Sequence, residues 1–174
     1  MQGGRYVDAA LGRSSPSVGQ KENIMTTTKT SKRVMAFVDG ASANNQNAAE
    51  RLGGWAAILM LVDADGIRDE RDAAYKELSG ALPGSTNNQA ELEAVKQVLL
   101  ALKQPGVTVT IVTDSSYMIG VLSQHWKAAK NKELISEIKA LMETHSVTFE
   151  KVAGHSGVEY NVRADQLAVA ATQL

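Results

Sequence analysis

Four carboxylates stand at positions where their charge is hard to explain unless something binds there: Asp39, Glu91, Asp114 and Asp165. Asp39 and Asp114 each close an apolar or β-branched run, and Glu91 and Asp165 each lie on the apolar stripe of a helical pattern. A carboxylate at the edge of an apolar core is costly unless it is paired, and converging carboxylates repel one another. The pattern therefore predicts a site for divalent cations.

The elements that must position these acids follow from hydrophobic periodicity. Apolar runs and turn signals predict five strands and four helices in the order βββαβααβα, an α/β domain with a mixed sheet. The first three strands are expected to form an antiparallel meander, and ligands bind at the carboxyl ends of strands in open α/β sheets. The predicted strands cover 34–39, 52–62, 67–79, 107–113 and 146–153, and the predicted helices cover 88–103, 115–124, 132–145 and 159–172.

Three of the four acids also have an ordinary structural explanation. Asp39 could open a turn, and Asp114 could cap the helix that follows it. Glu91 could be the third residue of a capping box whose cap is Asn88. No cap or turn explains Asp165. Taken together, these explanations leave four like charges without a counter-charge, so bound cations account for them better.

The ligand set narrows the choice of cation. The chain has no cysteine, so a metal must be held by oxygen or imidazole. An all-carboxylate site suits Mg²⁺, with Mn²⁺ as a substitute. Two such ions about 3.5–4 Å apart would activate the attacking water and stabilise the leaving oxygen in a displacement at phosphorus. The reaction that this chemistry implies is phosphodiester hydrolysis.

Length and composition suit one domain that follows an N-terminal tail. Of the 174 residues 44% are hydrophobic, and no apolar run approaches the ~18 residues of a membrane span. Residues 1–32 are polar and show no apolar periodicity, which predicts a disordered tail before a folded domain at 33–174. The first 33 residues hold six basic and two acidic residues, a net of +4, so the other 12 basic and 17 acidic residues leave a net of −5. An acidic domain can bind a polyanion only through local basic patches or bound metal.

Five short blocks follow one another along the chain: FVDG at 37–40, TNNQAEL at 86–92, TDS at 113–115, GHSG at 154–157 and NVRAD at 161–165. Their content and order resemble the signature blocks of type I ribonuclease H. The resemblance covers residues 33–174 and implies the ribonuclease H-like fold, with three antiparallel and two parallel strands in one sheet flanked by helices. It also implies an endonuclease that hydrolyses the RNA strand of RNA/DNA hybrids and leaves 5′-phosphate and 3′-hydroxyl ends.

The resemblance implies roles for individual residues as well. The four acids would hold two Mg²⁺ ions when substrate is bound, and His155 would assist proton transfer or product release. Contacts to the hybrid are implied for Asn44, Asn87, Asn88, Gln89, Asn161 and Arg163. Amides can both donate to and accept from the 2′-hydroxyl, the group that separates RNA from DNA in the minor groove. Alternatively, His155 is an ordinary loop residue, the asparagines serve loops and caps, and Arg163 is a helix-surface charge.

Two departures from the family pattern lie in segments that are expected to bind the substrate. The loop at 41–47 lacks the Gly/Pro-rich run that is common in the family. Between Gln124 and Lys132, many bacterial members carry an extra helix and a basic handle, of which only Trp126, Lys127, Lys130 and Lys132 itself remain here. We expect Lys127 and Lys130 to contact the hybrid, and the enzyme to bind it weakly.

Two other classes of function stay open. A nucleic-acid-binding module could keep the fold without catalysis, although the loss of an acid would then be expected. Another nuclease of the same superfold, such as a junction resolvase or transposase core, would act on DNA. The blocks at 86–88 and 154–157 favour the ribonuclease, which we expect to be a cytoplasmic monomer.

Overall fold

The computed structural model describes residues 32–44, 46–47, 49–63, 75–153 and 159–174. Within these ranges the elements follow one another in the predicted order βββαβααβα. The strands are β1 (Arg33–Ala43), β2 (Leu52–Val62), β3 (Lys76–Pro83), β4 (Thr108–Thr113) and β5 (Ser146–Lys151). The helices are α1 (Asn87–Ala101), α2 (Ser116–Ser123), α3 (Lys132–Met142) and α4 (Glu159–Ala171).

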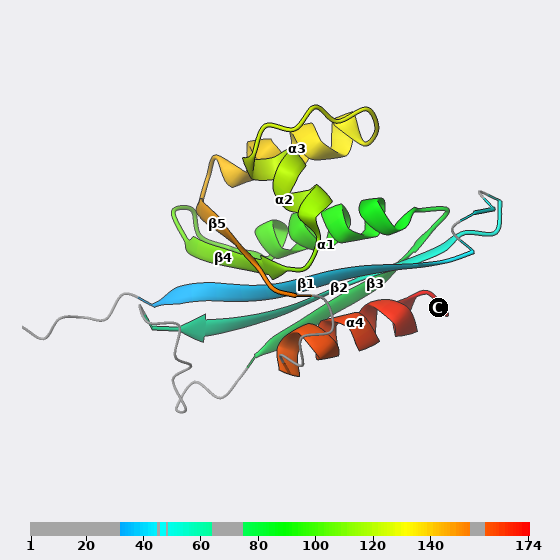
Figure 1. The fold of residues 1–174 in the computed structure, drawn as a ribbon. Helices are drawn as coiled ribbons and strands as arrows, with labels where there is room; N and C mark the ends of the chain where they lie inside the picture. The colour runs from blue at the N-terminus through cyan, green and yellow to red at the C-terminus, as the bar shows by residue number, and fades with distance from the viewer. Residues whose placement is uncertain (1–31, 45, 48, 64–74, 154–158) are drawn as a thin grey trace, which may run out of the picture.

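β1 lies at the centre of a five-stranded sheet with the strand order β3-β2-β1-β4-β5 (Figure 1). It pairs antiparallel with β2, and β2 pairs antiparallel with β3. On its other side β1 pairs parallel with β4, and β4 pairs parallel with β5. Parallel neighbours need a crossover connection, which α2 and α3 supply between β4 and β5. The predicted mixed sheet flanked by helices is therefore confirmed.

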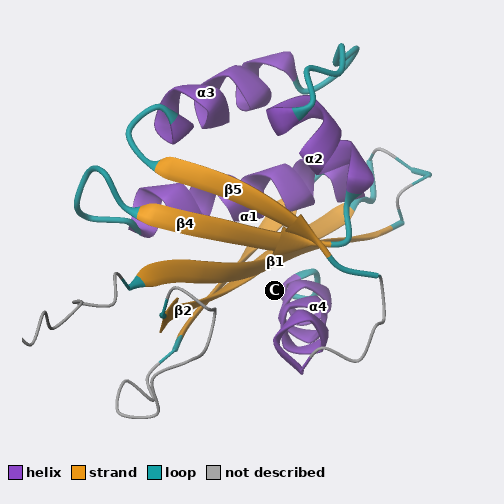
Figure 2. Cartoon of the chain, turned by 60° about the vertical axis from the view of Figure 1, so that its left-hand side comes forward, coloured by secondary structure: helices purple, strands orange, loops and turns teal. Residues whose placement is uncertain are grey.

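Helices cover both faces of this sheet: α1, α2 and α3 lie on one face and α4 on the other (Figure 2). The core is divided in the same way, because side chains alternate between the two faces of a strand. Ala36 and Val38 of β1 pack in the part of the core beneath α1. Phe37 packs in the other part, with Ile58 of β2 and Ala164 of α4. The sheet thus separates two apolar layers, and its inner strands β2, β1 and β4 carry the buried residues, whereas the edge strands β3 and β5 are partly exposed.

β1 is longer than predicted, and this changes the position of Asp39. The predicted strand ended at Asp39, whereas β1 continues to Ala43. The continuation is stable because β2 pairs with β1 along its whole length, from Arg33 opposite Val62 to Ala43 opposite Leu52. β4 pairs with β1 only from Val34 to Phe37. Asp39 is therefore a residue inside a strand, just beyond the point where one of its two neighbouring strands has ended.

The third strand ends later in the chain than predicted. Of the predicted range 67–79, residues 67–74 lie outside the described part of the chain, and β3 begins at Lys76 and reaches Pro83. The predicted loop at 80–87 is thus partly strand. Gly80 pairs with Trp55 of β2, whose indole lies across it. Pro83 is tolerated because β3 is an edge strand and needs no donor on its outer side.

β2 covers its predicted range, and the remaining elements differ from prediction by one to three residues at an end, the largest difference being at the end of α3. There the amides of Thr144 and His145 donate to the carbonyls of Leu141 and Met142, so tight turns close the helix three residues early. The predicted tail at 1–32 lies outside the described residues except for Lys32. None of the described helices is long and apolar enough to cross a membrane.

Candidate active site

The four carboxylates singled out in the sequence line one hollow of about 240 Å³. Each comes from a different part of the fold: Asp39 from β1, Glu91 from α1, Asp114 from the residue after β4, and Asp165 from α4. The remaining residues that line it are Gly40, Asn87, Asn161 and Val162. The structure therefore brings together acids that are up to 126 positions apart in the sequence.

Strand register explains why Asp39 and Asp114 share this hollow. Phe37 and Val112, which pair across β1 and β4, both pack in the part of the core beneath α4. Because the side-chain period of a strand is two, Asp39 and Asp114 emerge on that same side. β4 has ended at Thr113, so no further strand residue fills the space beside Asp39.

Gly40 explains why Glu91 reaches the same place. A Cβ atom built on Gly40 would lie 2.6 Å from the carbonyl carbon of Ala90, closer than real atoms of this kind approach. Because glycine has no Cβ, the first turns of α1 can lie directly against β1 at this point. The close approach sets Glu91 beside the strand that carries Asp39.

Glu91 is buried, and both of its carboxylate oxygens are held by hydrogen bonds. Ser115 Oγ donates to Glu91 Oε2, and Asn87 Nδ2 donates to Glu91 Oε1 at 2.9 Å. Burial raises the pKa of Glu91, whereas the hydrogen bond from Ser115 lowers it and repulsion from Asp114 raises it again. These two donors fix the direction in which the carboxylate points.

The ordinary explanations for Glu91 and Asp114 are wrong. α1 is capped by Thr86, whose Oγ1 accepts from the Gln89 amide at 3.3 Å while Gln89 Oε1 accepts from the Thr86 amide at 2.8 Å. Asn88 is not the cap, and Glu91 takes no part in this capping box. α2 is capped by Ser115, whose Oγ accepts from the Met118 amide at 3.2 Å. Asp39 does not open a turn either, because it lies within β1.

Electrostatics make the hollow unfavourable for four charges without a counter-ion. The pKa of Asp39 is raised from 3.8 to about 7, chiefly by burial, and repulsion from Asp114, Asp165 and Glu91 contributes to the rise. The amide of Gly40, which donates to Asp39 Oδ1 at 2.7 Å, opposes it. A divalent cation would relieve this repulsion, and oxygen-only ligands are those that Mg²⁺ and Mn²⁺ prefer. The donor chemistry of the hollow therefore fits such an ion.

The acids surround the hollow without closing on a common point. Among the described residues no three carboxylate or imidazole groups are already arranged as a set of metal ligands. Mutual repulsion keeps like charges apart, and Glu91 is drawn towards Asn87 and Ser115. The hollow thus fits a cation by the kind and number of its oxygen donors, and not by a ligand geometry that is already formed.

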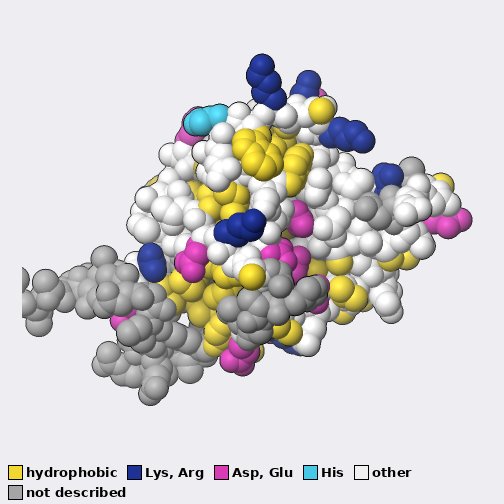
Figure 3. Space-filling view, viewed as in Figure 1, with side chains coloured by type: hydrophobic (Ala, Val, Ile, Leu, Met, Phe, Trp, Pro, Cys, Tyr) yellow, Lys and Arg dark blue, Asp and Glu magenta, His cyan; other side chains and the backbone are white. Residues whose placement is uncertain are grey.

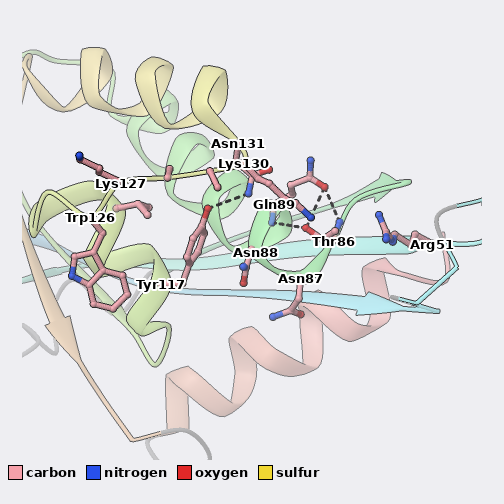
Figure 4. A pocket seen from close by; sticks show the side chains of 13 residues that line it. Arg51, Thr86, Asn87, Asn88, Gln89, Tyr117, Trp126, Lys127, Lys130 and Asn131 are labelled. Carbon is pink, nitrogen blue, oxygen red and sulfur yellow. Dashed lines mark hydrogen bonds between the residues drawn. The ribbon is translucent and has the colours of Figure 1, made fainter.

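A second, larger groove of about 820 Å³ shares Asn87 with the acid hollow, and Figure 4 shows the side chains that line this groove. Asn87, Asn88 and Gln89 at the start of α1 form one wall, and Lys127 and Lys130 lie on the other. Asn87 lines both the groove and the acid hollow, so it joins the two. Five of the eight predicted substrate residues therefore gather in one place.

The other predicted residues are placed differently. Asn161 is buried and lines the acid hollow rather than the groove. Asn44 is exposed at the end of β1, where its Nδ2 donates to the Glu50 carbonyl at 3.3 Å. Arg163 forms an exposed two-pronged ion pair with Glu77 of β3, at 2.8 and 3.1 Å, which supports the alternative of a helix-surface charge. His155 lies outside the described residues.

Two features of the site were missed by the sequence prediction. Ser115 was noted only as part of the TDS block, although it contacts Glu91 directly and caps α2. Tyr117 lines the groove and was not singled out at all. Its position three residues after Asp114, on the first turn of the helix that follows, was the available signal. Arg51, Thr86 and Asn131 also line the groove.

Comparison with known proteins agrees with this geometry. The family model for RNase H matches residues 31–173. The chain is 36% identical over 156 residues to a ribonuclease H of Chlorobium luteolum, with 82% of this chain and 97% of that one covered. It is 37% identical over 154 residues to a ribonuclease H of Chlorobium phaeobacteroides strain BS1, with 80% and 95% covered.

Solved structures are similar in fold. RNase H1 from the halophilic archaeon Halobacterium salinarum matches with a TM-score of 0.60 and 25% identity, over 81% of this chain and 98% of that one. The N-terminal RNase H domain of a Mycobacterium tuberculosis protein matches with a TM-score of 0.64 and 23% identity, over 82% and 95%. The chain therefore belongs to the ribonuclease H family, enzymes that generally use divalent metal ions and act on RNA/DNA hybrids.

Proposed function

We propose that this protein is an endonuclease that hydrolyses the RNA strand of RNA/DNA hybrids and leaves 5′-phosphate and 3′-hydroxyl ends. The observation that carries the proposal is the hollow in which Asp39, Glu91, Asp114 and Asp165 meet, directly beside an amide-lined groove. A phosphodiester is itself an anion, so it can approach four carboxylates only if cations lie between them. Family membership supports the same chemistry.

The four carboxylates would hold two Mg²⁺ ions, for which Mn²⁺ could substitute. When bound, such ions lower the pKa of a water and neutralise charge at the reacting phosphate. The chain's own part is to keep the ligands in place. Asn87 and Ser115 hold Glu91 in one orientation, and the close approach at Gly40 keeps α1 against β1. His155 is proposed to assist proton transfer or product release.

The groove supplies the choice of substrate. Asn87, Asn88 and Gln89 present amides beside the acids, and an amide can donate to or accept from a 2′-hydroxyl. Lys127 and Lys130 on the facing wall are suited to the phosphates of a second strand. A duplex with one ribose strand and one deoxyribose strand satisfies both walls.

Two competing functions are less well supported. A binding module without catalysis has no need of four acids in one hollow, yet all four are kept there. The DNA substrate of a DNA nuclease has no 2′-hydroxyl for the amide side chains of Asn87, Asn88 and Gln89 to contact. We further propose that the enzyme acts as a monomer in the cytoplasm.

One gel experiment tests the proposal. End-labelled RNA/DNA hybrid, double-stranded RNA and double-stranded DNA are each incubated with Mg²⁺, Mn²⁺ or a chelator, and with Asp114→Asn as the matched inactive control. We expect cleavage of the RNA strand of the hybrid alone, with either metal, and none with chelator or with the variant. Equal cleavage of double-stranded DNA would overturn the proposal.

A further inference from the structure

The loop between α2 and α3, residues 124–131, is fastened to α2 at both ends. At its start the Trp126 amide donates to the Gly120 carbonyl at 3.0 Å, and the same carbonyl accepts from the Gln124 amide at 3.1 Å. At its end Asn131 Nδ2 donates to the Tyr117 hydroxyl at 3.3 Å (Figure 4). Since Gly120 and Tyr117 both belong to α2, a single helix determines where the loop lies.

The contact between Gly120 and Trp126 depends on the absence of a side chain. Gly120 is buried, and a Cβ atom built on it would overlap the indole, with Trp126 Cε2 at 2.8 Å and two further ring atoms closer still. The indole therefore lies directly against the backbone of α2. Its other face is open, because Trp126 is 52% exposed. Glycine in the middle of a helix is unfavourable by itself, so a packing reason for it is expected.

The backbone of the loop is strained at both ends. His125 and Asn131 have φ angles of 59° and 60°, in the left-handed region that residues other than glycine rarely adopt. Asn131 is also the N-cap residue of α3, yet its side chain makes no capping hydrogen bond and turns to Tyr117 instead. Such strain persists only where the surrounding contacts enforce it, and it is often found at functional sites.

The fastened loop supplies much of the lining of the groove. Trp126, Lys127 and Lys130 line the groove opposite the start of α1. Trp126 also lines a second hollow of about 430 Å³, in which Lys132 and Lys139 of α3 take part. The indole thus stands between two hollows that both contain lysines. A strand of nucleic acid that passed from one hollow to the other would run beside the indole.

We propose that Gly120 is a positioning residue for the hybrid: by leaving room for Trp126 against α2, it fixes the groove wall that carries Lys127 and Lys130. This inference rests on the proposed function. In a chain with only a short basic segment at this point, few contacts are available to hold the substrate. A wall that is already ordered loses less conformational entropy on binding, so those few contacts retain more of their strength.

A double-mutant cycle tests the inference. Gly120→Ala, Trp126→Ala and the double variant are compared with the parent for kcat and KM on a labelled hybrid. Acrylamide quenching of Trp126 is measured with and without Gly120→Ala in a Trp55→Phe background, so that Trp126 is the only tryptophan in the chain.

We expect Gly120→Ala to raise KM about five- to tenfold, the size of losing one aromatic contact to a base, with kcat within about twofold. Quenching should increase, and Gly120→Ala should have no further effect on KM in the Trp126→Ala chain.

Three outcomes would overturn the inference. One is an unchanged KM in Gly120→Ala; another is an equal rise in KM in both backgrounds, which would mean that Gly120 acts without Trp126. If circular dichroism shows that Gly120→Ala is unfolded, Tyr117→Phe takes its place, since it removes only the hydroxyl that holds Asn131. An unchanged KM there is the third contradicting result, and a rise of about twofold supports the inference. A parent that does not cleave the hybrid contradicts the proposed function, while quenching still reports separately whether Gly120 positions Trp126.

Discussion

At the scale of single residues, Asp39 and Glu91 show two ways in which a buried carboxylate is accommodated. Glu91 has a side-chain donor on each oxygen, from Ser115 and Asn87. Asp39 has one backbone donor, Gly40, and three carboxylates around it. Burial raises the pKa of both, to about 7 in the case of Asp39. A bound cation would therefore relieve the repulsion at Asp39, which has no side-chain donor of the kind that holds Glu91.

The raised pKa of Asp39 predicts how stability depends on pH in chelator. Between about pH 4 and 7 the folded state holds a proton that the unfolded state, with an ordinary pKa of 3.8, has released. The free energy of unfolding therefore falls as pH rises through this window, and Glu91 acts in the same direction. We expect Asp39→Asn to flatten this dependence, to raise the melting temperature near pH 7, and to abolish cleavage. Urea denaturation in EDTA between about pH 4 and 7 measures the free energy of unfolding of the parent and the variant. If Asp39→Asn left the dependence of this free energy on pH unchanged, the raised pKa of Asp39 would be contradicted.

Ser115 yields a prediction that separates orientation from helix capping. Ser115→Ala removes both the donor to Glu91 and the cap of α2, and we expect kcat to fall about tenfold, the value of a hydrogen bond to a charged group. Ser115→Gly keeps most of the capping stability and should lose the same activity, since glycine replaces an N-cap serine at a cost of only a few tenths of a kcal/mol. Ser115→Thr keeps the hydroxyl and should restore kcat. Steady-state rates measure the effect on kcat, and thermal melts measure the effect on stability. Full activity in Ser115→Gly would show that Ser115 has no role in orienting Glu91 for catalysis.

At the scale of elements, sequence periodicity was sufficient for the order of strands and helices and for the acids that they carry. It failed where pairing between strands decides the outcome. The extension of β1 to Ala43 depends on β2 lying opposite, and polar residues such as Ser42 give no sign of this in the sequence. The bonds from Ser115 and Asn87 to Glu91 likewise depend on how α1 and α2 meet. Contacts of that kind leave no periodic trace.

Arg163 is a second case in which the sequence did not predict a contact between elements. Its neighbours in the sequence line the acid hollow, whereas its own side chain pairs with Glu77 on β3. The ion pair joins α4 to the edge of the sheet. The Arg163 side chain is 46% exposed and that of Glu77 is 30% exposed, so water screens the pair and it contributes little to stability. We expect Arg163→Met to leave kcat/KM within about twofold of the parent and to change the melting temperature little. Glu77→Gln is the matched control and should behave alike. A large rise in KM for Arg163→Met alone would return Arg163 to the substrate contacts.

At the scale of the whole molecule, charge is distributed unevenly over an acidic domain. Basic side chains stand out at the top of the face in Figure 3, over α3 and the loop before it, and acidic side chains gather lower on that face, towards the sheet. Residues 34–174 carry a net charge of −5, so the overall field repels a polyanion. Binding of a hybrid must then depend on the few basic side chains that line the groove, which are Arg51, Lys127 and Lys130.

This dependence can be measured against a control with the same net charge. Lys127→Ala/Lys130→Ala removes two lysines that line the groove, and Lys76→Ala/Lys103→Ala removes two that do not. Each phosphate contact adds about 0.9 to the slope of log affinity against log salt for a B-form duplex, a value borrowed here for the hybrid, so the first pair should lower the slope by about 2 and raise KM. Its kcat should stay within about twofold of the parent, because these contacts lie away from the reacting phosphate. The control pair changes the overall field equally and should leave the slope and KM nearly unchanged. Equal losses in both pairs would show that net charge, and not the groove wall, holds the substrate.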